Sequence, residues 1–213
     1  MPIALPCFVR AARPACLAAL LAISASGAAA EGETGSQASF SASDIAAVAT
    51  GDFDRDGSRD AAMIVLPADE SAEGADLYIL MEGKSDDLPP GWLGVVLQAP
   101  GRIAAWSSPL AGQVPTLTAL EDGSLRVGTQ NTGIGRNAWE EEVTLTAEDG
   151  RFLVSRFAYR SFDRLQDEAP IECDLDLFAG TGVLNDRTID FEPRRVAYLD
   201  FDAADARGIC GAD

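Results

Sequence analysis

A short acidic segment near the start of the chain has the spacing of a calcium-binding loop. Four aspartates fall at the first, third, fifth and ninth places of residues 52–60, and Gly57 stands at the sixth. Carboxylates at alternate places of a tight loop converge on one point, the glycine permits the sharp turn, and the seventh residue offers its backbone carbonyl. Oxygen ligands of this kind suit a hard divalent cation. The sequence therefore predicts a Ca²⁺ site with the ligands Asp52, Asp54, Asp56, Ser58 and Asp60.

The residues that follow the loop in the sequence are consistent with a β-strand. Residues 61–67 form an apolar run typical of a buried strand, and Phe53 is expected to enter the core while Arg55 and Arg59 face solvent. The alternative is an acidic hairpin turn around Asp56 with no bound ion. Against it, close carboxylates repel one another and favour a counter-ion. An exported protein can use a weak site, with a Kd on the order of 0.1 to 1 mM.

The loop is not an EF-hand, because the twelfth place, where that motif has a glutamate, is Met63. The segment 51–57, followed by an apolar strand, instead resembles the calcium loop of FG-GAP and VCBS-type repeats. One copy of the segment occurs in this chain. The resemblance implies that the loop binds calcium.

A longer resemblance covers most of the chain. It is to a family of uncharacterised periplasmic proteins of proteobacteria that carry a single FG-GAP/VCBS-like calcium loop, and it implies a periplasmic location. The residues that carry it are 51–60, Asn131, 134–137, Trp139, 145–146, Tyr159, 173–177 and 180–182.

The amino-acid composition limits the kinds of partner that the protein can bind. The formal net charge is −18, from 16 basic and 34 acidic residues, so the surface repels phosphate backbones and anionic membrane surfaces. We therefore expect a divalent cation as partner and no nucleic acid. The chain has no histidine, which rules out a His-ligated zinc site, a Ser-His-Asp triad and a Cys-His dyad within it.

The first thirty residues have the pattern of a secretory signal peptide. Arg10 and Arg13 precede an apolar run over 15–23, and three alanines at 28–30 supply a small-residue cleavage site. We expect cleavage there, a periplasmic or secreted protein, and no membrane span in the mature chain. Residues 31–40 then predict a flexible N-terminus, and residues 41–213 a single β domain.

Two cysteines remain after the expected cleavage, Cys173 and Cys210. An even number of cysteines in an exported protein indicates a disulfide bond, and no CxxC spacing supports a redox-active pair. The bond would fix the C-terminal tail.

The rest of the chain predicts a mainly β fold. Asp122 and Asp149, each followed by glycine, mark two tight hairpin turns, and residues 139–147 alternate apolar and polar side chains with Glu141 as the one exception on the apolar side. We expect about ten short strands and few helices, arranged as an antiparallel meander, a sandwich or an open barrel. Within this pattern residues 45–49 fit a strand or a helical turn, residues 99–116 contain too much proline and glycine for one element, and residues 187–191 and 195–201 are predicted strands.

A second candidate site is the glycine-rich loop after Asn131. Arg136 in this loop can reach an anion, and Asn137 follows it, so the loop is a candidate for binding a small ligand or a partner. The alternative is a plain wide hairpin connection.

The favoured function is an exported, non-enzymatic calcium-binding β domain with a binding or structural role toward a protein or glycan. The alternatives are a periplasmic hydrolase that uses paired carboxylates, or a module of envelope adhesion or assembly. Since acids are abundant and no catalytic motif stands out, the sequence leaves open whether the protein is an enzyme.

Overall fold

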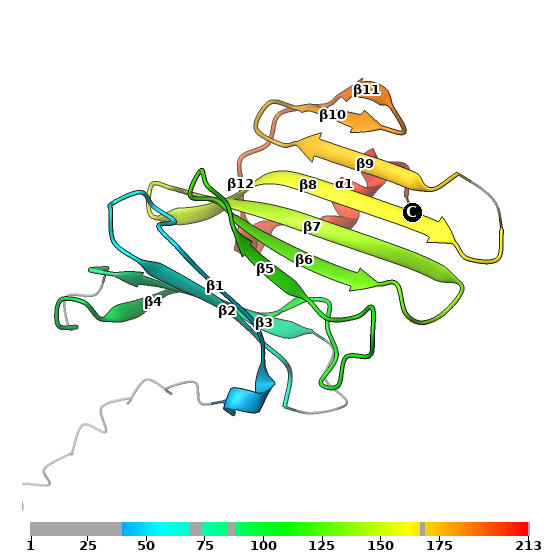
Figure 1. Ribbon diagram of the computed structural model, residues 1–213. Coiled ribbons are helices and arrows are strands. Elements are labelled where there is room, and N and C mark those ends of the chain that lie inside the picture. Colours follow the sequence, from blue (N-terminus) through cyan, green and yellow to red (C-terminus); the bar gives the residue numbers. More distant parts are fainter. Residues whose placement is uncertain (1–39, 69–73, 85–87, 167–168, 213) are drawn as a thin grey trace, which may run out of the picture. The chain divides into compact units, whose positions relative to one another are not determined.

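The computed structural model describes residues 40–68, 74–84, 88–166 and 169–212, and these residues form a mainly β structure (Figure 1). The predicted signal peptide over 1–30 and most of the predicted flexible segment lie outside the described residues. Within the described part, two antiparallel sheets of four and eight strands account for the fold, with one α-helix near the C-terminus. The predicted fold class is confirmed. No helix in that part is long and apolar enough to span a membrane.

The four-stranded sheet is a simple meander in which each strand pairs with the next. A 3₁₀ helix, η1 (Ala42–Asp44), leads into it, and Ser41 caps that helix. The strands are β1 (Ile45–Gly51), β2 (Asp60–Val65), β3 (Ala75–Glu82) and β4 (Leu93–Ile103).

The eight-stranded sheet continues the meander. Its main path runs in chain order from β5 to β11, and β12 pairs separately with β8. The strands are β5 (Thr116–Ala119), β6 (Leu125–Asn131), β7 (Asn137–Glu148), β8 (Arg151–Asp163), β9 (Ile171–Asp176), β10 (Thr181–Leu184), β11 (Arg187–Asp190) and β12 (Val196–Ala197). The 3₁₀ helix η2 (Tyr198–Asp200) and the helix α1 (Ala203–Ile209) end the described chain.

Both predicted Asp-Gly turns form. Asp149 and Gly150 take φ angles of 50° and 73° between β7 and β8, and Gly123 takes 80° between β5 and β6. Positive φ at both central residues suits the twist of a two-residue hairpin. The β10–β11 hairpin, which the sequence pattern missed, turns at Asn185 and Asp186 with φ angles of 46° and 65°.

Two expected element boundaries were wrong. Strand β4 does not stop where the proline- and glycine-rich segment 99–116 begins but runs through Pro100 to Ile103. It is the last strand of its sheet, and an edge strand tolerates a proline because the missing N–H faces no partner. The predicted strand over 195–201 is only two residues long and gives way to η2, and Asp202 then caps the unpredicted helix α1 by accepting from the amide of Ala204.

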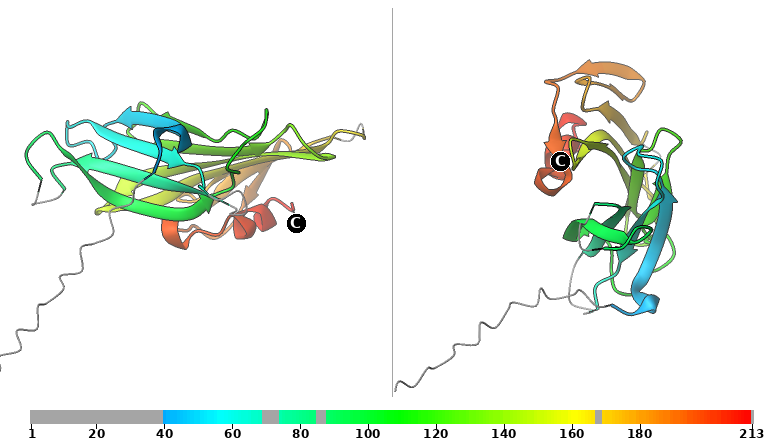
Figure 2. Two further views of the ribbon diagram at one scale, coloured as in Figure 1. Left: turned by 90° about the horizontal axis from the view of Figure 1, so that it is seen from below. Right: turned by 90° about the vertical axis from the view of Figure 1, so that its left-hand side faces the viewer.

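One hydrophobic core joins both sheets and the C-terminal segment. Ile64, Leu77 and Ile79 of the small sheet and Leu145, Phe157 and Leu175 of the large sheet are completely buried in it. Figures 1 and 2 show α1 lying against one face of the large sheet. Tyr198, Phe201 and Ala206 from this C-terminal segment belong to the same core. The segment therefore covers an apolar face of the large sheet that would otherwise be exposed to water.

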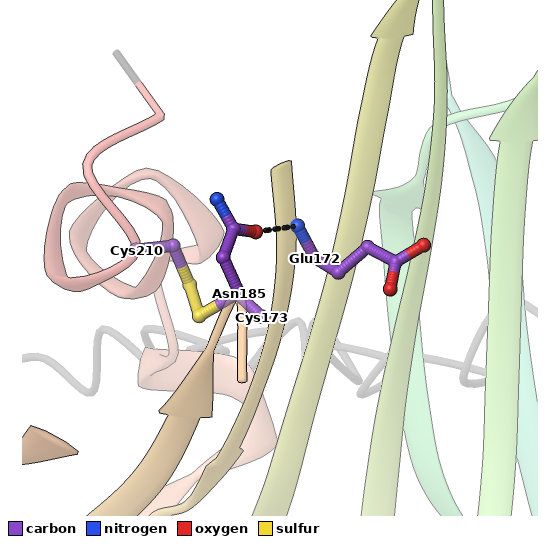
Figure 3. The surroundings of a disulfide bond; sticks show 4 residues. All are labelled: Glu172, Cys173, Asn185 and Cys210. Carbon is purple, nitrogen blue, oxygen red and sulfur yellow. Dashed lines mark hydrogen bonds between the residues drawn. A yellow bond between two sulfur atoms is a disulfide. The ribbon is translucent and has the colours of Figure 1, made fainter. Parts of the chain in front are cut away.

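The predicted disulfide is present and fastens α1 to the large sheet. Cys173 of β9 and Cys210, which ends α1, are joined, and both are buried (Figure 3). Beside the bond, the backbone amide of Glu172 donates to the Asn185 side-chain oxygen at 2.8 Å, which ties β9 to the β10–β11 turn (Figure 3).

Helix α1 also explains the exception in the alternation of β7. Glu141 points to the same face as the apolar residues around it, and its carboxylate accepts from Arg207 of α1 at 2.6 Å. Burial raises the pKa of Glu141, and the pairing with Arg207 opposes the rise. A charge on the inner face is therefore tolerated because the helix brings a partner to it.

Candidate metal centre

The acidic loop connects β1 and β2 at a point where the hairpin pairing has just ended. Gly51 and Asp60 form the last pair of the β1–β2 register, and residues 52–59 lie beyond it. Gly57 takes a φ of 89°, in the left-handed region, as its place in the motif requires. Phe53 is 3% exposed and belongs to the core, whereas Arg55 and Arg59 are exposed, as predicted.

The loop is organised by its own carboxylates. Asp52 accepts from the backbone amides of Asp56 at 3.1 Å and Gly57 at 3.0 Å, one through each oxygen. Asp54 accepts from the same Asp56 amide at 3.3 Å. Because a carboxylate oxygen has two lone pairs, each of these oxygens keeps capacity for a further ligand. The acids at the first and third places of the motif, Asp52 and Asp54, thus point into the loop.

Asp60 is the buried member of the motif. It is 1% exposed, and its carboxylate accepts from the Phe53 amide at 2.7 Å. Burial raises its pKa, the hydrogen bond from Phe53 opposes the rise, and the negative charge of Asp54 adds to it. A carboxylate in this position is stabilised in its charged form by a nearby cation.

Three of the predicted ligands converge. Asp52, Asp54 and Asp60 each offer a carboxylate oxygen, and these three oxygens lie within 4.8 Å of one another. Two oxygens bound to the same calcium ion, each about 2.3 to 2.6 Å from it, can be at most about 4.6 to 5.2 Å apart. The spacing of the three oxygens is therefore compatible with one shared ion.

Asp56 is engaged elsewhere. One of its oxygens accepts from the Ser58 amide at 2.8 Å, and the other lies 3.1 Å from the Lys84 ammonium, which is also 2.7 Å from Asp54. The bonds from Ser58 and Lys84 lower the pKa of Asp56. Bonds to Asp54 and Asp56 raise the pKa of Lys84 to about 12. The fifth place of the motif thus faces a lysine at the end of β3, outside the group of three carboxylates.

The loop also contacts the other sheet. The Arg55 guanidinium donates to the backbone carbonyl of Asp122, in the β5–β6 turn, at 2.8 Å from Nε. A Cβ on Gly123 would lie 2.9 Å from the carbonyl oxygen of Asp52, so glycine permits this close approach. Hydrogen bonds from Ser124 lower the pKa of Asp122. Arg55 itself takes a φ of 61°, which is unusual for a residue with a side chain.

The polar side chains of the second candidate site, the glycine-rich loop between β6 and β7, contact neighbouring segments. Asn131 closes β6, and its side-chain oxygen accepts from Gln113 at 3.4 Å and from the Ile134 amide at 3.3 Å. Arg136 pairs with Asp163 at 2.6 Å, which lowers the pKa of that aspartate. Asn137 begins β7 and is exposed. The contacts of Asn131 and Arg136 hold the ends of the long hairpins together.

The polar face of the large sheet carries a hollow of about 1000 Å³. It is lined mostly by residues of β5 to β11, and ion pairs cross it. Arg156 binds both oxygens of Asp174, at 2.9 and 2.8 Å, and Arg160 lies between Glu172 at 3.1 Å and Glu140 at 3.8 Å. Carboxylates and guanidinium groups thus alternate across the hollow.

Two residues that matter to the acidic loop were missing from the sequence prediction. Lys84 is 24 residues beyond Asp60, and Asp122 is on another sheet. Neither follows from local spacing. The one signal in the sequence was that Lys84 is the only lysine of a chain with 34 acids.

The chain was compared with models of known protein families, with curated proteins and with solved structures, and none of the three comparisons found a match.

Proposed function

We propose that this protein is a non-enzymatic calcium-binding β domain of the periplasm, in which the ion organises the β1–β2 loop. The observation that carries the proposal is the convergence of Asp52, Asp54 and Asp60, whose carboxylate oxygens lie within 4.8 Å of one another. Asp60 is buried, so the group has a fixed inner wall rather than three mobile surface acids.

The chemistry of the donors favours calcium over other metals. The three carboxylates, the Ser58 carbonyl and, after rotation, Asp56 are all oxygen donors, which hard cations prefer. Calcium accepts six to eight such ligands in flexible geometry, whereas magnesium needs a nearly ideal octahedron at about 2.0 to 2.1 Å. A loop with partly exposed acids and one buried carboxylate suits the more tolerant ion.

A structural role follows from where the loop lies. The loop is joined to the β5–β6 turn of the large sheet through Arg55, so an ion that orders the loop also strengthens the junction of the two sheets. The expected leader at residues 1–30 would deliver the domain to a compartment where calcium reaches the millimolar concentrations that a weak site needs. The hollow on the polar face offers the surface for a protein or glycan partner.

Thermal melting of the mature domain tests the proposal. If Kd is on the order of 0.1 to 1 mM, then 10 mM Ca²⁺ stabilises the folded state by about 1.4 to 2.7 kcal/mol relative to chelator. For a domain of this size we expect Tm to rise by about 3 to 10 °C. Asp54→Ala should abolish the response to calcium.

The control is Asp190→Ala, which removes an exposed acid from β11 and should keep the full calcium response. Equal melting temperatures for the wild-type domain in calcium and in chelator would contradict the proposal. So would a calcium response of the same size in Asp54→Ala.

A further inference from the structure

The ammonium group of Lys84 lies where a cation would bind the acidic loop. It is 2.7 Å from an Asp54 oxygen and 3.1 Å from an Asp56 oxygen. Lys84 lies two residues beyond the end of β3, so the strand brings its side chain beside the acidic loop. Among the described residues, it is the basic side chain that contacts the motif carboxylates.

A lysine in this position has two effects on a divalent ion. Its charge offsets part of the repulsion among the aspartates, which stabilises the ion-free loop. Lys84 also forms an ion pair with Asp54, which belongs to the group of three converging carboxylates. It forms another with Asp56, which would join that group if its side chain rotated. An ion that recruits both acids must therefore displace the ammonium or share Asp54 with it.

We propose that Lys84 is a tethered competitor that sets the calcium affinity of the loop. The inference rests on the proposed calcium site and concerns its regulation by the chain's own cation. In the ion-free state Lys84 holds Asp54 and Asp56, and calcium binding releases it. The lysine keeps the loop folded at low calcium, and it weakens the site in return.

The other basic residues of the loop do not share this role. Arg55 directs its guanidinium to the Asp122 carbonyl, away from the carboxylates. Arg59 is exposed on the loop, and among the described residues its side chain forms no ion pair with the motif carboxylates. Substitution of Arg59 therefore measures the general effect of charge, and substitution of Lys84 measures the effect of charge plus direct competition.

Calcium titration by calorimetry of the mature domain tests the inference, with the variants Lys84→Met, Lys84→Arg and Arg59→Gln. Lys84→Met keeps most of the side-chain volume and removes the ammonium. We expect it to bind calcium roughly three- to tenfold more tightly than the wild type, because two ion pairs no longer compete. Lys84→Arg, which retains the charge, and Arg59→Gln should both stay within about twofold of the wild type.

The outcomes separate the two proposals. If wild type and Lys84→Met bind calcium with the same affinity, the calcium site stands and the competitor role is wrong. Equal gains in Lys84→Met and Arg59→Gln would also overturn it, since the effect would then be general charge. If no variant binds calcium, the site itself is wrong and the competitor role falls with it. Binding by Lys84→Met alone would support both.

The single lysine allows a direct second measurement. Reductive methylation with ¹³C-formaldehyde labels one side-chain amine in the chain and keeps its positive charge. We expect the lysine methyl resonance to shift as calcium is added and to reach the position seen in Asp54→Ala with Asp56→Ala. A resonance that stays unchanged while calcium saturates the protein would show that Lys84 is not displaced.

Discussion

The carboxylate of Asp60 makes two separate contributions to the loop. It accepts from the Phe53 amide, which fixes the first turn of the loop, and it forms the buried wall of the group with Asp52 and Asp54. Phe53 is itself anchored in the core. The alternation of acidic and non-acidic residues in the motif thus places the carboxylates on one side and the core anchor on the other.

The spacing of the aspartates was enough to predict that Asp52, Asp54 and Asp60 converge, but it did not predict that Asp56 turns away from them. Local geometry brings Asp52, Asp54 and Asp60 together, because backbone amides within the loop hold the first two in place. The orientation of Asp56 depends on Lys84, which reaches it through the β2–β3 pairing. That contact depends on tertiary structure, so sequence spacing carries no information about it.

Glu141 gives a pH-dependent prediction at the scale of one residue. Its pKa is raised, so between the unfolded and the folded pKa the folded state binds more protons than the unfolded state. The stability that Glu141 gains by binding its proton more tightly in the folded state is therefore fully present at low pH. It is lost as pH rises through the folded pKa. We expect the stability of wild type relative to Glu141→Gln to increase as pH falls from 7 toward about 4.5, by about 1.4 kcal/mol for each unit by which the pKa is raised.

Urea denaturation at several pH values measures this difference. The matched control is Glu142→Gln, which removes the neighbouring carboxylate on the exposed face of the same strand. A relative stability of Glu141→Gln that does not vary with pH, or that varies in the opposite sense, would show that the pairing with Arg207 outweighs burial.

At the scale of elements, strands with one buried face were predictable and short irregular elements were not. The alternation over residues 139–147 fixes which side chains of β7 point inward, and the Asp149–Gly150 turn fixes the hairpin between β7 and β8. Helix α1 escaped prediction because its seven residues contain little apolar periodicity. Its position depends on tertiary contacts, namely the Cys173–Cys210 bond and the Glu141–Arg207 pair.

The disulfide should matter to α1 more than to the sheets. The bond closes a loop with a sequence separation of 37, which corresponds to at most about 4 kcal/mol of chain entropy in the unfolded state. We expect the Cys173→Ser, Cys210→Ser double variant to lose up to that amount in urea denaturation. Amide exchange in α1 should accelerate more than exchange in β7 and β8, which keep their ladder.

Addition of a reducing agent to the double variant provides the control, since it should change nothing further. If α1 and the central strands lose protection to the same extent, then the helix is part of the main cooperative unit and the bond stabilises the whole domain equally.

At the scale of the whole domain, the acidic loop lies at a seam between two sheets that share one core. β1 and β5 lie side by side, and the β1–β2 loop contacts the β5–β6 turn through Arg55 and through the close approach of Gly123 to Asp52. If calcium orders the loop, as we propose, then the effect should cross this seam. Sequence alone could not indicate the seam, because its two sides are 67 residues apart.

Hydrogen exchange with and without calcium tests this coupling. We expect calcium to slow amide exchange in residues 53–58 and also in residues 122–124, several-fold in each, because Arg55 holds the turn against an ordered loop. In Arg55→Ala the protection of 53–58 should persist while that of 122–124 is lost. Arg59→Ala removes the same charge without this contact and should behave as wild type. Calcium protection of the turn that survives in Arg55→Ala would mean that the two sheets are coupled through the shared core rather than through the loop.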